Sequence, residues 1–110
     1  MNSILKFPVN EPSAYSTVML DASLNSPDGL LLGNNNRELT VVNNAGGGEG
    51  KVLSFTNMDK FETATLTGSF ITGPVFPTTA TTDGKNIYVL HAYLHLRGTG
   101  HDGFAIQPAP

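Results

Sequence analysis

Two stretches of the chain decide its fold: residues 27–43 read PDGLLLGNNNRELTVVN, and residues 77–91 read PTTATTDGKNIYVLH. Each begins with proline, continues as a short strand-like run, turns at Gly, Asn or Asp residues and ends in a β-rich run. β-Branched and aromatic residues favour strands, whereas Gly, Asn and Asp favour tight turns. Each stretch is therefore predicted to form a β-hairpin, and the two hairpins are offset by about 50 residues.

A further strand is expected after each hairpin. Residues 51–55 (KVLSF) follow a glycine-rich loop at 45–50, and residues 103–107 (GFAIQ) follow a glycine-containing loop and stop before Pro108. We align residues 52–55 with 104–107. A unit of several short strands that recurs after 40–50 residues is typical of propeller blades. The alternative is that any two hairpins align passably once gaps are allowed.

Composition supports the all-β class. Of the 110 residues only 14% are charged, while 12 are Gly and 7 are Pro, which suits short strands joined by many turns. The length suits one domain. We expect a single all-β domain of antiparallel sheets, with a lead-in at 1–17, a first blade-like unit at 18–70 and a second at 71–110.

Charge and cysteine content exclude several functions. The net charge is −3 and the six Lys and Arg residues are scattered, so neither nucleic acid nor an anionic membrane is an expected partner. Cysteine is absent, which excludes disulfides and thiolate chemistry. The longest wholly apolar run, Leu30–Leu32, is too short to span a bilayer. No signal peptide is visible, a soluble chain is expected, and the compartment stays open.

The two hairpin stretches resemble a known family. The residues SPDGL at 26–30 followed by LTVVNN at 39–44 are similar to a blade of the gluconolactonase and senescence-marker-protein type of six-bladed propeller. NHL-repeat propellers share this pattern. The residues FPTTA at 76–80 and DGKNIYV at 83–89 resemble the following blade. The resemblance covers about residues 18–107 and implies an incomplete propeller of about two blades.

The resemblance also implies a metal site. Lactonases of that family bind one divalent cation, usually calcium, through carboxylate and Asn oxygens. The Asp of the PDGL step maps to Asp28, and Thr79 takes the place of an Asn ligand. A hydroxyl is a poorer ligand for a hard cation than an amide carbonyl. The other acidic ligand and the catalytic acid/base belong to blades that this chain lacks. For Asp28 the structural alternative is an Asx-turn before Gly29.

Three further residues are candidates for binding. Asn43 and Asn44 end a predicted strand and could line a channel mouth, or could instead satisfy backbone groups of the following loop. His91 and His95 are four residues apart, a zinc-binding spacing on a helix. Here the context predicts a strand, on which they lie roughly 13 Å apart. His91 remains a binding candidate, with a surface or hydrogen-bonded strand-end histidine as the alternative.

No motif predicts catalysis. The loop at 45–50 lacks the Lys-Ser/Thr and the helix of a phosphate-binding loop, and no serine has nucleophile-elbow context. We therefore expect a non-catalytic propeller-type structural or interaction module without a required cofactor. Its unpaired sheet edges call for self-association or a longer propeller chain as partner. A small independent β-sandwich or barrel is a further possibility for the fold. The functional alternative is a calcium-dependent lactone or ester hydrolase.

Overall fold

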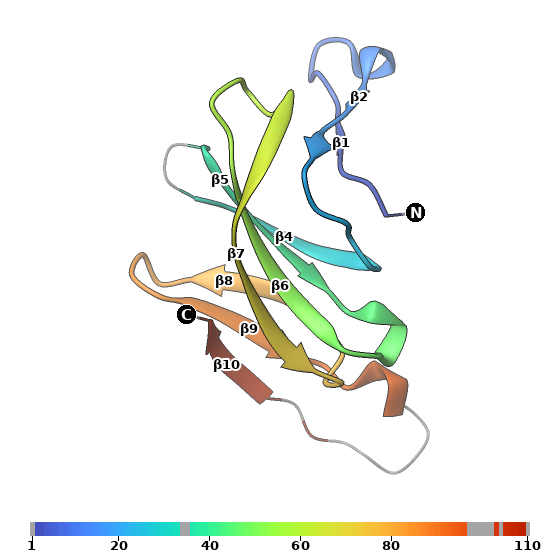
Figure 1. Ribbon diagram of the computed structural model, residues 1–110, viewed down its shortest axis with the longest axis vertical. Coiled ribbons are helices and arrows are strands. Elements are labelled where there is room, and N and C mark those ends of the chain that lie inside the picture. The colour runs from blue at the N-terminus through green and yellow to red at the C-terminus, as the bar shows by residue number, and fades with distance from the viewer. Residues whose placement is uncertain (1, 34–35, 97–102, 104, 110) are drawn as a thin grey trace.

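The computed structural model describes residues 2–33, 36–96, 103 and 105–109 (Figure 1). The protein is all-β, as predicted. Its described residues form the strands β1 Leu5–Lys6, β2 Ser16–Thr17, β3 Met19–Leu20, β4 Pro27–Gly33, β5 Glu38–Asn43, β6 Gly50–Thr56, β7 Thr63–Gly73, β8 Pro77–Thr82, β9 Ile87–His91 and β10 Ala105–Ala109. Three single 3-10 turns, η1 Pro12–Ala14, η2 Ala45–Gly47 and η3 Leu94–Leu96, lie between them. Among the described residues, no helix has the length and hydropathy to cross a membrane.

The strands form two main sheets and one small hairpin. The five-stranded sheet has the order β3-β7-β6-β5-β4, the three-stranded sheet has the order β10-β9-β8, and β1 pairs with β2. Neighbouring strands are antiparallel with one exception: β3 runs parallel to β7. The prediction of antiparallel sheets is confirmed for every other pair of neighbouring strands among the described residues. Strand β3 is far from β7 in the chain, and no hairpin connects the two strands. The connection therefore does not force them to be antiparallel.

The two predicted hairpins have the same register. In the β4–β5 pair, Pro27 lies opposite Asn43, and the register shifts by one residue before Gly29. In the β8–β9 pair, Pro77 lies opposite His91, with the same shift before Thr79. Each hairpin therefore has a β-bulge directly after its proline. The alignment of residues 27–32 with 77–82, and of 39–43 with 87–91, matches these registers residue by residue.

The third strand of the second unit differs from the prediction. Val52 lies opposite Val42, and Ile106 lies opposite Leu90, the counterpart of Val42. The counterpart of Val52 is therefore Ile106 and not Phe104, which itself lies outside the described residues. The strand also continues through Pro108 to Ala109. Proline is tolerated here because β10 is an edge strand, where a missing N–H need not interrupt a ladder.

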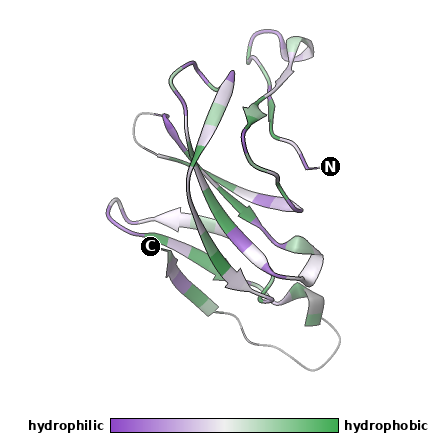
Figure 2. Cartoon of the chain, in the orientation of Figure 1, coloured by the Kyte–Doolittle hydropathy of each residue, from purple (hydrophilic) through white to green (hydrophobic). Residues whose placement is uncertain are grey.

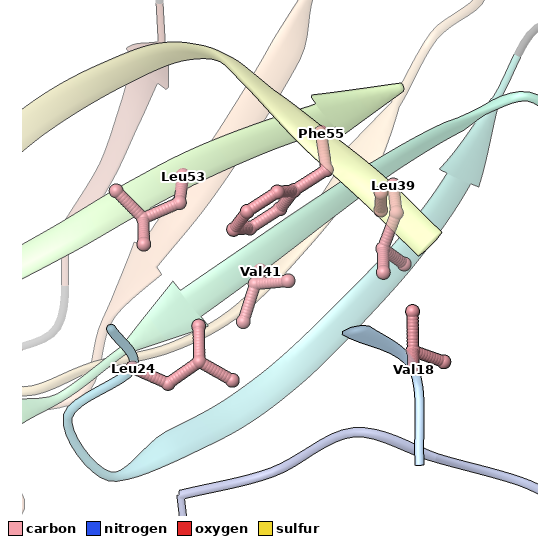
Figure 3. Packing of buried hydrophobic residues seen from close by; sticks show 7 residues of the cluster. Val18, Leu24, Leu39, Val41, Leu53 and Phe55 are labelled. Atoms are coloured by element: carbon pink, nitrogen blue, oxygen red, sulfur yellow. The ribbon is translucent and has the colours of Figure 1, made fainter. Parts of the chain in front are cut away.

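One face of the five-stranded sheet packs on the N-terminal segment. A buried hydrophobic cluster lies at this contact, and Figure 3 shows Phe55, which is fully buried, among its side chains. The cluster joins sheet residues to Val18 and Leu24 of the segment; its buried members are Val18, Leu24, Leu39, Val41, Leu53, Phe55 and Ala64. Lys6 of the segment donates to the backbone oxygen of Lys60 at 2.9 Å. The predicted lead-in at 1–17 thus contains the short strand β1, which pairs with β2.

The opposite face of the five-stranded sheet packs on the three-stranded sheet. Figure 1 shows the strands β8 to β10, orange to red, on the side away from the blue N-terminal segment. Val42 and Val52 of the first sheet and Val89 of the second form a separate buried cluster. Strand β8, which is rich in threonine, is pale in Figure 2, whereas β9 beside it is green. The five-stranded sheet is thus covered on both faces.

Two glycines permit the close packing of the sheets. A Cβ on Gly29 would lie 2.5 Å from the backbone oxygen of Thr78 and 2.6 Å from the Cα of Thr79. A Cβ on Gly50 would lie 2.6 Å from the Cδ of Pro77, a fully buried residue. Real side chains do not approach backbone this closely. Strands β4 and β8 therefore touch backbone to backbone, at their bulges.

We expect Gly29→Ala to lower the free energy of unfolding by about 2 kcal/mol or more, because the new methyl group must push β8 away. Urea unfolding followed by circular dichroism measures this change. Gly33→Ala is the matched control, since a Cβ at Gly33 meets nothing within 4 Å. Equal unfolding midpoints for the two variants would show that the sheets are not in close contact at Gly29.

Candidate functional site

Asp28 lies in strand β4 and not in an Asx-turn. The chain turns at Ser26, whose φ is 52°, and Pro27 already belongs to the strand. Asp28 is the additional residue of the bulge, and its exposed carboxylate accepts a hydrogen bond from the side-chain amide of Asn44 at 3.3 Å (Oδ2 to Nδ2). The bulge explains the failure of the turn prediction, because it places an irregular residue inside a strand.

Thr79 is the structural counterpart of Gly29. Both follow the bulge residue of their hairpin, and the two positions lie against each other, as the contact at Gly29 shows. The side chain of Thr79 is exposed. The two proposed metal-ligand positions, Asp28 and Thr79, therefore lie on neighbouring strands of different sheets, near the same backbone contact. The described residues contain no group of three or more His, Asp or Glu side chains arranged to hold a metal ion.

Asn43 and Asn44 bind the backbone of the loops around them. Asn43 is buried, and its Oδ1 accepts from the backbone N–H of Asn25 at 2.9 Å. Asn44 Oδ1 accepts from the backbone N–H of Gly46 at 2.8 Å, at the start of η2. A hollow of about 370 Å³ lies beside Asn43, with Glu49 and Lys51 in its wall. These contacts agree with the structural alternative given for both residues.

His91 is the counterpart of Asn43 and is buried in the same way. Only 6% of its surface is exposed, so His91 is not the surface histidine that the alternative describes. Its Nε2 has no hydrogen-bond partner among the described residues, and its ring contacts Tyr93 edge-on at 6.3 Å between centroids. Burial lowers the pKa of His91, and the side chain of Gln107 on β10 opposes this shift. The histidine is therefore held neutral inside the protein.

His95 does not share a strand with His91. Strand β9 ends at His91, so His95 belongs to the 3-10 turn η3, and the spacing expected for an extended strand does not apply. Tyr93 between them has a φ of 53°, which turns the chain away from the strand direction. His101 lies outside the described residues.

The outer face of the three-stranded sheet carries an apolar surface that sequence reasoning did not single out. Leu90 and Ile106 are opposite each other on β9 and β10, and their counterparts Val42 and Val52 are the buried pair of the sheet contact. Ile106 is 70% exposed, and Leu90 is half-buried. Alternation along β9 places Tyr88 on this face as well. The alignment of the two units could have revealed this surface, but it matched Val52 with Phe104, two residues before the true counterpart Ile106.

Comparisons with known proteins add no relative. The chain matches no protein-family model, no curated protein and no solved structure.

We expect calcium to leave the melting temperature unchanged, because among the described residues Asp28 belongs to no group of three or more acidic or histidine side chains, whereas calcium takes six to eight oxygen ligands. Thermal unfolding with calcium and with a chelator measures this. A rise with calcium that Asp28→Asn abolishes would instead establish a site at Asp28, since a ligand of the native state stabilises it.

We expect stability to fall as the pH is lowered through about 6.5, the ordinary pKa of histidine. Burial in the folded state favours the neutral form of His91, so the unfolded chain binds the proton more readily. The contribution of His91 to the free energy of unfolding is therefore present in full only above that pH. Urea unfolding between pH 8 and pH 5 measures the loss. His91→Asn, the residue found at the counterpart position, should flatten the curve; an equally steep curve in this variant would assign the pH dependence to another group.

Proposed function

We propose that the chain is a non-catalytic structural or interaction module of the β-propeller type, which packs its outer sheet face on a further β-sheet unit. One observation carries the proposal. The pair of half-buried Leu90 and exposed Ile106 occupies the position that the buried pair Val42–Val52 uses to cover the next sheet in the same chain. A surface of this composition is suited to bury apolar area against another sheet.

The chemistry of this face supports a protein partner. The residues of β9 and β10 that share the face by alternation are Tyr88, Leu90, Ile106 and Pro108, and none is charged. Aromatic and apolar residues without charge are typical of the centre of a protein interface. The charge recorded beside this face is the carboxylate of Asp83, which accepts a hydrogen bond from the hydroxyl of Tyr88 at 3.3 Å.

The side chain of Thr79 limits which strands the partner sheet can cover. In the first unit, Gly29 lets β8 approach backbone to backbone, and its counterpart in the second unit carries a β-branched side chain. A third sheet stacked in the same way would meet that side chain. The partner therefore packs over β9 and β10, away from β8.

The partner sheet belongs either to a second copy or to a further unit of a longer propeller chain. The repeated hairpin, with the same register and the same bulge, supports a unit that stacks on its own kind. The resemblance to gluconolactonase-type blades supports the longer chain. Both sources offer the same chemistry, an apolar sheet face.

We expect Ile106→Lys to weaken self-association at least about tenfold, because a charge at the centre of an apolar contact must be desolvated. Sedimentation equilibrium over a wide concentration range measures this. Ile71→Lys is the matched control, since Ile71 is also an exposed isoleucine in a strand, at 55%. Equal association of the two variants would argue against this face.

A labelling experiment covers a weakly associating partner. The chain has no cysteine, so Ile106→Cys introduces a single thiol, and Ile71→Cys is again the control. Joining two copies by a flexible linker raises their effective concentration to about the millimolar range. Labelling at position 106 should then slow relative to position 71. Equal slowing, or none, at both positions would count against docking on this face.

A further inference from the structure

An apolar groove lies beside strand β4. Leu30 and Leu32 lie opposite Val41 and Leu39, two members of the cluster around Phe55, and therefore point to the same face of the sheet. Each of the two leucines is nevertheless 53% exposed. A groove of about 380 Å³ lies between these leucines and the N-terminal segment, and its wall also includes Ile4, Leu5, Val18 and Phe61. The apolar surface of the core is therefore open to solvent along this groove.

Three cationic side chains gather where this groove meets a second hollow. Phe61 belongs to the wall of the groove and also to the wall of the second hollow, the cationic hollow, which has a volume of about 380 Å³ and contains Arg37 and Lys60. Lys6 belongs to the wall of the groove; its Nζ donates to the backbone oxygen of Lys60 at 2.9 Å and forms an ion pair with Glu62 at 3.4 Å. Half of the six Lys and Arg residues, which are scattered in the sequence, thus lie near one aromatic ring. Among their described residues, neither wall contains Asp or Glu.

Two of these cations have no carboxylate partner. Within the described ranges the ion pair of Lys6 is the only one, so neither Arg37 nor Lys60 is paired there. The acidic residue next to Lys60 is Asp59, and its carboxylate accepts hydrogen bonds from the backbone N–H and the hydroxyl of Thr63 at 3.1 and 2.7 Å. Arg37 and Lys60 are both exposed. Their charges are therefore available to an anion from solution.

Asn57 fixes the positions of the residues around the cationic hollow. It is only 5% exposed, and its side-chain amide donates to the backbone oxygens of Asn36 and Arg37 at 3.2 and 3.1 Å. Its Oδ1 accepts from the backbone N–H of Phe61 at 2.9 Å. Phe61 has a φ of 62°, a conformation that is costly for a bulky residue and persists only where the surrounding structure imposes it. Arg37 and Phe61 are thus held relative to each other before a ligand arrives, which lowers the entropic cost of binding.

We propose that the groove and the cationic hollow together bind one anionic amphiphile, a carboxylate with a single unbranched apolar chain. The chain lies along Leu30 and Leu32, and the carboxylate lies beyond Phe61, between Arg37 and Lys60. A largely apolar pocket of roughly 300–1,000 Å³ with a few convergent polar groups is typical of small-molecule sites. The planar guanidinium of arginine matches the geometry of a carboxylate, and its hydrogen bonds to that group are charge-assisted.

Charge complementarity distinguishes this ligand from other occupants of an apolar groove. A neutral apolar molecule, or the apolar face of another sheet, would gain no ionic interaction with Arg37 and Lys60. A cationic amphiphile would be repelled by both. The inference goes beyond the proposed function, since the site lies on a different surface from the Leu90–Ile106 face.

Equilibrium dialysis with radiolabelled octanoate, below the concentration at which it forms micelles, measures the binding. Octanol, which has a chain of the same length and no charge, is the matched control ligand. We expect a single octanoate to bind per chain, at least about tenfold more tightly than octanol. Octanol is the more hydrophobic molecule, so a contact driven by apolar burial alone would give the reverse order.

Four variants locate the two ends of the ligand. Arg37→Gln should weaken octanoate binding about tenfold and leave octanol binding unchanged, because Arg37 contacts the head group alone. Lys51→Gln is the matched control, since Lys51 is also an exposed cation, at the opposite end of the β5–β6 ladder. Leu32→Asn should weaken the binding of both ligands, because it removes apolar surface from the groove. Ile106→Lys should bind octanoate as the wild-type chain does. Thermal unfolding verifies that each variant is folded.

Three results would overturn the proposal. The first is a wild-type chain that binds no octanoate at millimolar concentration. The second is octanol binding as tightly as octanoate. The third is Arg37→Gln losing no more affinity for octanoate than Lys51→Gln does. Each of these results leaves the proposed sheet-stacking function standing, because that function depends on Ile106 and not on Arg37.

Discussion

The structure depends on a backbone contact between two sheets. At the bulges of β4 and β8 the strands touch where Gly29 has no side chain, and Gly50 gives the same freedom beside Pro77. Close-packed interiors transmit small changes in volume, so a single methyl group at this contact alters the spacing of the sheets. The burial of Val42, Val52 and Val89 follows from that spacing.

The same contact makes the two units unequal. Their hairpins share register and bulge, yet the first unit is covered on both faces and the second on one. With threonine in place of Gly29, the second unit cannot accept a third sheet in the same geometry. Repetition of sequence therefore does not imply unlimited stacking. The apolar pair Leu90–Ile106 corresponds in register to the buried pair Val42–Val52, and the proposed function rests on this correspondence.

The bulges also determine where the candidate residues lie in the structure. Asn43 and His91 lie opposite the prolines that precede the bulges, and both are buried there. Asn43 bonds the loop backbone, whereas Nε2 of His91 has no hydrogen-bond partner within the described part of the chain, and burial lowers the pKa of this histidine. One position of the repeat thus holds a hydrogen-bonded asparagine in one unit and a buried histidine in the other. Asp28 and Thr79 lie near the contact, and in the described ranges neither belongs to a group of three or more acidic or histidine side chains.

Sequence alone determined the all-β class, the positions of the strands β4, β5, β6, β8 and β9, and the alignment of residues 27–32 with 77–82, because local propensity and turn chemistry dictate these features. It did not determine the register of β10, the parallel β3–β7 pair, the burial of His91 or the exposure of Leu30 and Ile106. These depend on which surfaces meet. A residue's local pattern says that it is apolar, but only the packing of distant segments decides whether another sheet covers it.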